Sequence, residues 1–233
     1  MAKLISADLT NNKLCIFEYT TIGGQMLSFK EDAFDAKIVS HTYTDIGKVL
    51  FDKPITKIGD YAFSACKSLT SVTIPDSVTT IKDYAFSACI SLTSVTIPDS
   101  VTAIRESAFA YCYSLKEFNG KFAADNGRCL IIDGVLNAFA IGCGVTQYTI
   151  PDSVTTIGDR AFMGRNSLTS VTIGKSVSEI GRAAFNGCNI DTIVCCPKIP
   201  PKINDSFDRF ENLIVPTGCE EAYANSDWGQ YLE

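Results

Sequence analysis

The chain has 233 residues, a hydrophobic content of 46% and a formal net charge of −6. This composition supports a packed core and excludes a disordered chain. The 20 lysine and arginine residues form no cluster, which argues against a nucleic-acid-binding surface. No apolar run approaches the roughly 20 residues of a membrane-spanning helix, so we expect no membrane insertion.

Residues 1–47 do not follow the pattern of the rest of the chain and are expected to form an N-terminal cap. The pair Gly23–Gly24 suggests a hairpin turn in this region. The first residues contain neither a continuous apolar segment nor a small-residue cleavage site, so the chain as written is expected to be cytoplasmic unless an export signal was removed. The only histidine, His41, is expected to be a surface or packing residue rather than a catalytic base.

A unit of 23 residues repeats between residues 48 and 195. The unit is anchored by a column of large apolar residues, Leu69, Leu92, Leu115, Val145, Leu168 and Ile190. A fixed period of this size is typical of a solenoid, in which each unit buries its apolar face only against its neighbours. We therefore expect one elongated domain rather than two globular ones.

Each unit contains one predicted strand and one predicted helical segment. The pattern L-x-x-V-x-I predicts a strand, which ends at Pro75, Pro98 or Pro151 because proline cannot donate to a continuing ladder. The segment D-Y-A-F-S-A-C predicts one or two turns of helix with aspartate as the N-cap. The predicted class is α/β, with parallel strands on the concave side and short helical turns on the convex side.

The unit at 115–144 carries seven extra residues. Two apolar runs flank Asp133–Gly134, a type I′ turn signal, which predicts a β-hairpin at about 128–139. Residues 196–233 are expected to form a C-terminal cap, in which Trp228 covers the core of the last unit.

Four of the ten cysteines, Cys66, Cys89, Cys112 and Cys188, occupy one slot of the repeat. Equivalent slots of a solenoid stack and face inward, so we expect buried free thiols. Gly142 and Arg165 occupy this slot in other units, which means that no pairing is required. A structural disulfide, or metal or redox chemistry, is the alternative, and the sequence does not define a role for the pair Cys195–Cys196.

The repeated pattern L-x-x-V-x-I-P-x-S-V-x-x-I-x-x-x-A-F-x-x-C resembles the BspA-like, Treponema-type leucine-rich repeats over about residues 48–195. It carries Ser77 and its equivalents where the commonest leucine-rich repeats have an asparagine ladder. The resemblance implies a right-handed solenoid that acts in adhesion or protein binding at bacterial surfaces. It also implies a protein ligand, such as a host matrix or cell-surface protein, and a surface or secreted location.

The residues between the inward positions of each strand are expected to point outward onto the concave face. The candidate binding residues are Ser71, Thr73, Ser94, Thr96, Lys116, Glu117, Asn119, Gln147, Thr149, Ser170 and Thr172. They predict a shallow, hydroxyl-rich surface on which Lys116, Glu117 and Gln147 are the most distinctive side chains. One alternative is a solvated β-favouring face kept uniform by repeat duplication; a second, an ice-binding surface, is disfavoured by the interruptions at Glu117 and Asn119.

No motif in the chain predicts a catalytic site, a metal site or a cofactor. The prediction is therefore a non-enzymatic protein-binding or adhesion module. The alternative is a structural or assembly subunit of a phage or cell-surface complex, which an exposed apolar patch on the caps would favour. The sequence determines neither the ligand nor the oligomeric state.

Overall fold

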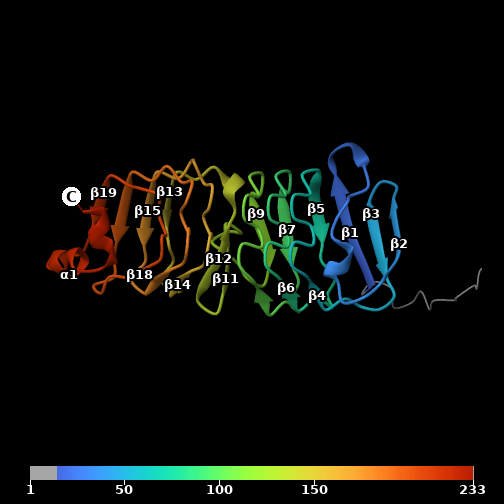
Figure 1. Ribbon diagram of the computed structural model, residues 1–233, viewed down its shortest axis with the longest axis horizontal. Coiled ribbons are helices and arrows are strands. Elements are labelled where there is room, and N and C mark those ends of the chain that lie inside the picture. Colours follow the sequence, from blue (N-terminus) through green and yellow to red (C-terminus); the bar gives the residue numbers. More distant parts are fainter. Residues whose placement is uncertain (1–14, 233) are drawn as a thin grey trace, which may run out of the picture.

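The computed structural model describes residues 15–232 and shows one elongated solenoid of about seven coils (Figure 1). Strands and turns make up most of the described residues, and α1 (Glu220–Ala224), a single short α-helix in that part of the chain, lies near the C-terminal end. The predicted solenoid with parallel sheets is confirmed. Residues 1–14 of the predicted N-terminal cap lie outside the described residues.

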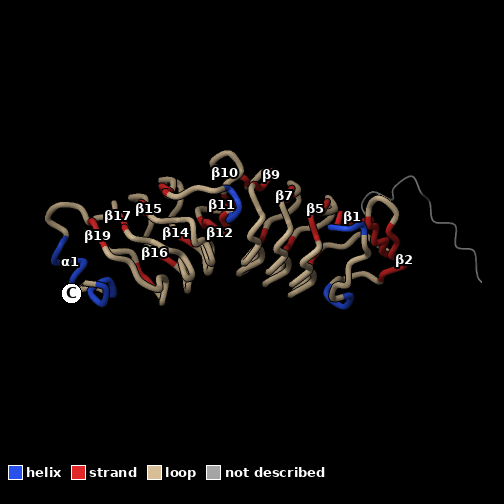
Figure 2. The backbone as a smooth tube through the Cα atoms, turned by 90° about the horizontal axis from the view of Figure 1, so that it is seen from above, coloured by secondary structure: helices blue, strands red, loops and turns tan. Residues whose placement is uncertain are grey.

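Coil strands form two faces that run along the body. The long-strand face contains β5 (Leu69–Thr73), β7 (Ser94–Ile97), β9 (Glu117–Gly120), β13 (Gln147–Thr149), β15 (Ser170–Ile173), β17 (Thr192–Cys195) and β19 (Asn212–Ile214). The short-strand face contains β4 (Lys57–Ile58), β6 (Thr80–Ile81), β8 (Ala103–Ile104), β12 (Val135–Phe139), β14 (Thr156–Ile157), β16 (Glu179–Ile180) and β18 (Lys202–Ile203). Equivalent residues of successive repeats lie opposite each other, as Val72 and Val95 do, and the coils stack along the long axis (Figure 2).

Three antiparallel strands precede the first coil: β1 (Ile16–Thr21), β2 (Ile38–Tyr43) and β3 (Gly47–Phe51), with the short 3-10 turns η2 (Ile22–Gly24) and η3 (Glu31–Ala33). The strand order β2-β3-β1-β5 joins them to the long-strand face. Gly23 and Gly24 both have a positive φ, but the two edges of β1 pair with β3 and β5. The hairpin predicted at this glycine pair is therefore wrong, and the hairpin of this region joins β2 to β3.

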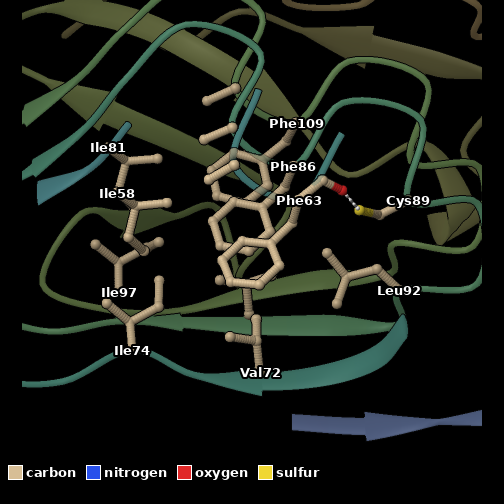
Figure 3. Packing of buried hydrophobic residues seen from close by; sticks show 14 of the residues in the cluster. Ile58, Phe63, Val72, Ile74, Ile81, Phe86, Cys89, Leu92, Ile97 and Phe109 are labelled. Atoms are coloured by element: carbon tan, nitrogen blue, oxygen red, sulfur yellow. Dashed lines mark hydrogen bonds between the residues drawn. The ribbon is translucent and has the colours of Figure 1, made fainter. Parts of the chain in front are cut away.

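Stacked aromatic rings fill the interior between the two faces. The ring centroids of Phe63 and Phe86 lie 5.2 Å apart and those of Phe86 and Phe109 lie 5.4 Å apart, with nearly parallel planes (Figure 3). The Cys89 thiol donates to the Phe63 carbonyl of the preceding coil at 3.1 Å, and Leu92 lies on the same side of the rings as Cys89 and is fully buried (Figure 3). All ten cysteines, each within the described residues, are free thiols, and the four of the repeated slot are buried as predicted.

The segments predicted to be helical consist of hydrogen-bonded turns. In the coil at 59–66, the Phe63 N–H donates to the Ala85 carbonyl of the next coil at 2.7 Å, whereas the Ser64 N–H donates within its own turn to Tyr61 at 3.1 Å. Tyr61 and Ala65 adopt left-handed conformations, with φ of 60° and 59°. The prediction of helix is wrong here because alternate amides bond to the neighbouring coil, which a helix does not allow.

The predicted hairpin at 128–139 is confirmed. β11 (Cys129–Ile132) pairs with β12 in antiparallel orientation, and Asp133 and Gly134 between them both have a positive φ, as a type I′ turn requires. The other edge of β11 pairs with β10 (Ala123–Ala124). Because β12 also pairs in parallel with β14, the hairpin is part of the solenoid wall rather than an appendage.

This hairpin lies in an irregular coil, residues 116–145, which we call the junction coil. It also contains the 3-10 turn η4 (Ile141–Cys143). β9 ends one sheet and β13 begins another, and on the other face β8 and β12 belong to different sheets. The buried residues likewise form two clusters. We call the part from β1 to β9 the first stack and the part from β12 to β19 the second stack, so the junction coil contributes β9 to the first stack and β12 to the second.

Candidate binding surfaces

The predicted binding residues lie on or beside the long-strand face. Thr73 and Thr96 lie opposite each other in β5 and β7 and are exposed, while Val72 and Val95 beside them are buried. The other candidates, Ser71, Ser94, Lys116, Glu117, Asn119, Gln147, Thr149, Ser170 and Thr172, are all exposed or half-buried. The predicted alternation of inward and outward residues is therefore confirmed, and a role of these residues in binding stays a prediction.

Near β1 the long-strand face is a network of short hydroxyl side chains. Thr20 Oγ1 lies 2.6 Å from Ser71 Oγ and 2.7 Å from Thr70 Oγ1. Such side chains project little and already bond to one another. Tyrosine, tryptophan and arginine, which dominate strong protein interfaces, do not occur at the eleven predicted positions.

The structure separates the most distinctive candidates into two groups. Glu117 and Asn119 lie on β9 and Gln147 lies on β13, and these strands belong to different sheets. The Phe118 N–H of β9 donates to the Gly127 carbonyl at 2.7 Å, so the chain leading to the hairpin occupies the edge of β9. The predicted surface is therefore interrupted between Asn119 and Gln147.

A buried arginine closes the second stack against the junction coil. Arg165 is fully buried, and its guanidinium donates to the carbonyls of Ala140, Ile141 and Val145 and contacts the thiol of Cys143 at 3.3 Å. Its guanidinium also lies 4.7 Å from the centre of the nearby Phe139 ring. Burial lowers the pKa of Arg165 from its ordinary value, since water no longer solvates the charge. The arginine substitutes for a cysteine of the repeated slot and satisfies carbonyls that the irregular coil leaves without a ladder partner.

A second surface lies on the turns that precede and follow each core phenylalanine. Its members are four exposed or half-buried tyrosines of the first stack and one half-buried arginine of the second stack: Tyr61, Tyr84, Tyr111, Tyr113 and Arg160. We call this set the turn-face patch. Tyr61 and Tyr84 stack with their ring centroids 4.9 Å apart, and the Arg160 guanidinium lies 5.7 Å from the centre of the Tyr84 ring.

The patch spans the junction between the two stacks. Arg160 Nη1 lies 3.4 Å from the hydroxyl of Ser107, which is 53 residues earlier in the chain. The junction coil has two residues fewer between Leu136 and Phe139 than the next coil has between Ile157 and Phe162. It therefore lacks the projecting turn of the other coils, and Arg160 reaches across the gap.

Four members of the patch occupy left-handed backbone positions. Tyr61, Tyr84, Tyr111 and Arg160 have φ between 56° and 60°. The equivalent slot in other coils holds Ser107 or Ala183, which also have a positive φ, and this conformation costs any residue with a Cβ about 1–2 kcal/mol. The left-handed backbone is therefore common to several coils, and the patch differs from them in the exposed or half-buried tyrosine and arginine side chains that it carries.

Sequence reasoning missed the turn-face patch. The signal was visible in the column before each A-F pair, where Tyr61, Tyr84 and Arg160 replace smaller residues. In a helical segment these side chains would point in different directions around the helix axis. Because a helix was predicted here, the side-by-side placement of these residues in successive coils was not expected. The alternating hydrogen bonds of the turns instead place equivalent residues of successive coils side by side.

Residues 15–232 also contain a groove and a histidine outside these two surfaces. A groove of about 760 Å³ between residues 175–178 and 196–202 is lined by three lysines, Cys196, Ile199 and small residues, without a histidine or carboxylate. His41 hydrogen-bonds to the Tyr19 hydroxyl, and burial lowers its pKa. Within residues 15–232, no group of three or more histidine, cysteine or acidic side chains could hold a metal ion, and no helix is long and apolar enough to cross a membrane.

Comparison with solved structures finds the same fold in one bacterial protein, and two weaker similarities accompany it. A leucine rich cell surface protein of Faecalibacterium prausnitzii is 24% identical with a TM-score of 0.54, over 72% of this chain and 59% of that one. The pneumococcal vaccine antigen PcpA is 14% identical with a TM-score of 0.46, over 72% of this chain and 62% of that one. A leucine-rich repeat protein of Eubacterium ventriosum is 20% identical with a TM-score of 0.44, over 70% of this chain and 59% of that one. The chain thus spans about three fifths of the length of these neighbours.

Comparison with protein families gives the more extensive match, whereas a search of curated proteins finds none. Six copies of the BspA type leucine rich repeat region cover residues 37–123 and 136–225. The gap between the two matched segments coincides with the start of the hairpin in the junction coil. The chain therefore belongs to the BspA type leucine-rich repeat family.

Proposed function

We propose that this chain is a non-enzymatic protein-binding module that recognises its ligand through the turn-face patch. The observation that carries the proposal is the alignment of Tyr61, Tyr84 and Arg160 in strained, left-handed turns. Tyrosine and arginine are the residues that most often dominate the binding energy of protein interfaces. The stacked rings are also fixed before binding, so little side-chain entropy is lost when a ligand covers them.

The long-strand face is the second candidate surface for the same function. Its support is the set of exposed charged and amide side chains beside the junction coil, namely Lys116, Glu117 and Gln147. Short hydroxyl side chains surround them, so we expect this face to bind more weakly than the turn-face patch.

We further propose that the module acts at a cell surface, with a host matrix or cell-surface protein as ligand. The support is family membership and the description of the Faecalibacterium neighbour as a cell surface protein. Right-handed winding with the long strands on the concave side is part of this proposal. So is the division into an N-terminal cap (1–47), repeats (48–195) and a C-terminal cap (196–233). The rival function is that of an assembly subunit in a phage or cell-surface complex.

The test is a binding assay of the full chain against an array of purified extracellular matrix proteins. The decisive variant is Tyr61→Gly/Tyr84→Gly, because glycine keeps the left-handed backbone and removes only the rings. Loss of two central aromatic anchors is expected to weaken binding by at least about tenfold.

Two matched variants complete the experiment. Ala65→Gly/Ala88→Gly changes the other left-handed slot of the same coils and is expected to leave binding unchanged. Lys116→Ala/Glu117→Ala/Gln147→Ala tests the long-strand face. Binding that survives loss of the two rings but disappears in the triple variant would transfer the function to the long-strand face, and binding that survives both would contradict both surfaces.

A further inference from the structure

The two end strands of the solenoid differ in their protection. β2 is the end strand of the six-stranded sheet ordered β2-β3-β1-β5-β7-β9, and among residues 15–232 no strand pairs with its outer edge (Figure 1). It is six residues long, with Val39 60% exposed. β19, the end strand at the other terminus, has only three residues and is followed by Pro216. A long end strand presents unpaired N–H and C=O groups that can accept a further strand.

The composition of β2 does not prevent such pairing. Its sequence, IVSHTY, contains no aspartate, glutamate, lysine, arginine or proline, which are the residues that usually protect an end strand. A bulge between Ile38 and Ser40 distorts only the beginning of the strand. The segment Ser40–Tyr43 is therefore regular and uncharged at its edge.

The charges that flank β2 indicate what covers it. Lys37 precedes the strand and Asp45 follows it, and both side chains are exposed. When two copies of β2 pair in antiparallel orientation, the start of one strand lies beside the end of the other. Lys37 of each copy then lies near Asp45 of the other, which gives two attractive contacts related by a two-fold axis.

One exposed apolar side chain lies at the same end of β2. Ile46, in the β2–β3 turn, is 40% exposed. The first residues of the second copy's strand would cover it.

From this edge, its flanking charges and the exposed Ile46 beside it, we infer that the protein forms a two-fold dimer through antiparallel pairing of β2 with β2 of a second copy. The pairing joins the six-stranded sheets of the two copies, each running from β2 to β9, into one continuous sheet. This inference is independent of the proposed binding function, since it uses no residue of the turn-face patch or of the predicted binding face.

Sedimentation velocity of the full chain over a concentration series tests the dimer. We expect a shift from monomer to dimer as the concentration rises, and Ser40→Lys is expected to abolish it. Lys37→Asp and Asp45→Lys should each weaken dimerisation by about tenfold, because each change turns two attractive contacts into repulsive ones. The double variant Lys37→Asp/Asp45→Lys should restore it.

Ile214→Lys on β19 is the matched control, since this residue is 52% exposed on the opposite end strand. Circular dichroism of every variant checks that the solenoid is folded. A wild-type chain that stays monomeric at all concentrations overturns the inference, whether hydrogen exchange finds the β2 amides open or covered by another part of the chain. A dimer that persists in Ser40→Lys overturns it as well. So does a dimer that the single charge reversals do not weaken or that the double reversal does not restore.

Discussion

The first and second stacks are built from the same repeat, yet they are separate in both sheets and in the core. Each stack has its own row of parallel phenylalanine rings, with Phe63–Phe86 in the first and Phe162–Phe185 in the second. The junction coil between them carries the irregular features: the hairpin, the missing turn and the contacts of Arg165. One irregular coil is therefore enough to end every ladder of a solenoid whose other coils are nearly identical. The stability of such a protein is expected to be a sum over its units and their interfaces.

The cysteine column should behave alike in the two stacks. Burial raises the pKa of Cys112 in the first stack and of Cys188 in the second to about 12 each. The thiolate is the reactive form, so both thiols should react about a thousandfold more slowly at neutral pH than unperturbed ones, and faster as the pH rises toward 12. Native alkylation followed by mass spectrometry measures this, with the exposed Cys196 as the internal fast control.

Complete titration after denaturation without reductant must find all ten thiols. Fewer than ten would contradict the free-thiol assignment. Fast alkylation of Cys112 but not of Cys188 in the native protein would show that the cysteine column is not equally buried in the two stacks.

Truncation of an equivalent core leucine should lower the free energy of unfolding by the same amount in both stacks. Leu92 and Leu168 occupy the same slot and are fully buried. Leu92→Ala and Leu168→Ala should each lower the free energy of unfolding by about 2–5 kcal/mol, measured by urea denaturation. A cost below about 1 kcal/mol would mean that the inward position of this column is wrong.

Loss of the buried arginine should destabilise the junction coil. Arg165→Met leaves the Ile141 carbonyl without its donor and removes one of two donors each from the Ala140 and Val145 carbonyls. We expect it to lower the free energy of unfolding by about 1–3 kcal/mol. Arg182→Met, at an exposed position of the second stack, is the matched control and should change stability by less than about 0.5 kcal/mol. Equal effects of the two substitutions would show that Arg165 does not stabilise the junction coil.

The smallest expected effect concerns the left-handed turns. Ala88 in the first stack has φ of 58°, and the equivalent position in the second stack is Gly164 or Gly187. Ala88→Gly should raise the free energy of unfolding by about 0.5–1 kcal/mol, because glycine adopts this conformation without steric cost. The same substitution at Ala85, which is buried and lacks a positive φ, should be destabilising.

The sequence predicted those parts of the fold that depend on periodicity and local turn chemistry. The apolar columns are confirmed except at the half-buried Val145, and the inward cysteines and the type I′ turn at Asp133–Gly134 are confirmed. The helical segments were predicted wrongly because hydrogen bonds between coils, which no local pattern encodes, replace those within a helix. For the same reason the sequence indicated neither the break between β9 and β13 nor the alignment of Tyr84 with Arg160.

Hydrogen exchange of Leu92→Ala most directly tests whether the junction coil divides the solenoid into two stacks. Local destabilisation raises exchange only in the part of the chain that unfolds together with the altered residue. We predict faster exchange of the amides in β5, β7 and β9, with unchanged exchange in β15, β17 and β19. Equal acceleration in all six strands would contradict the division into two stacks.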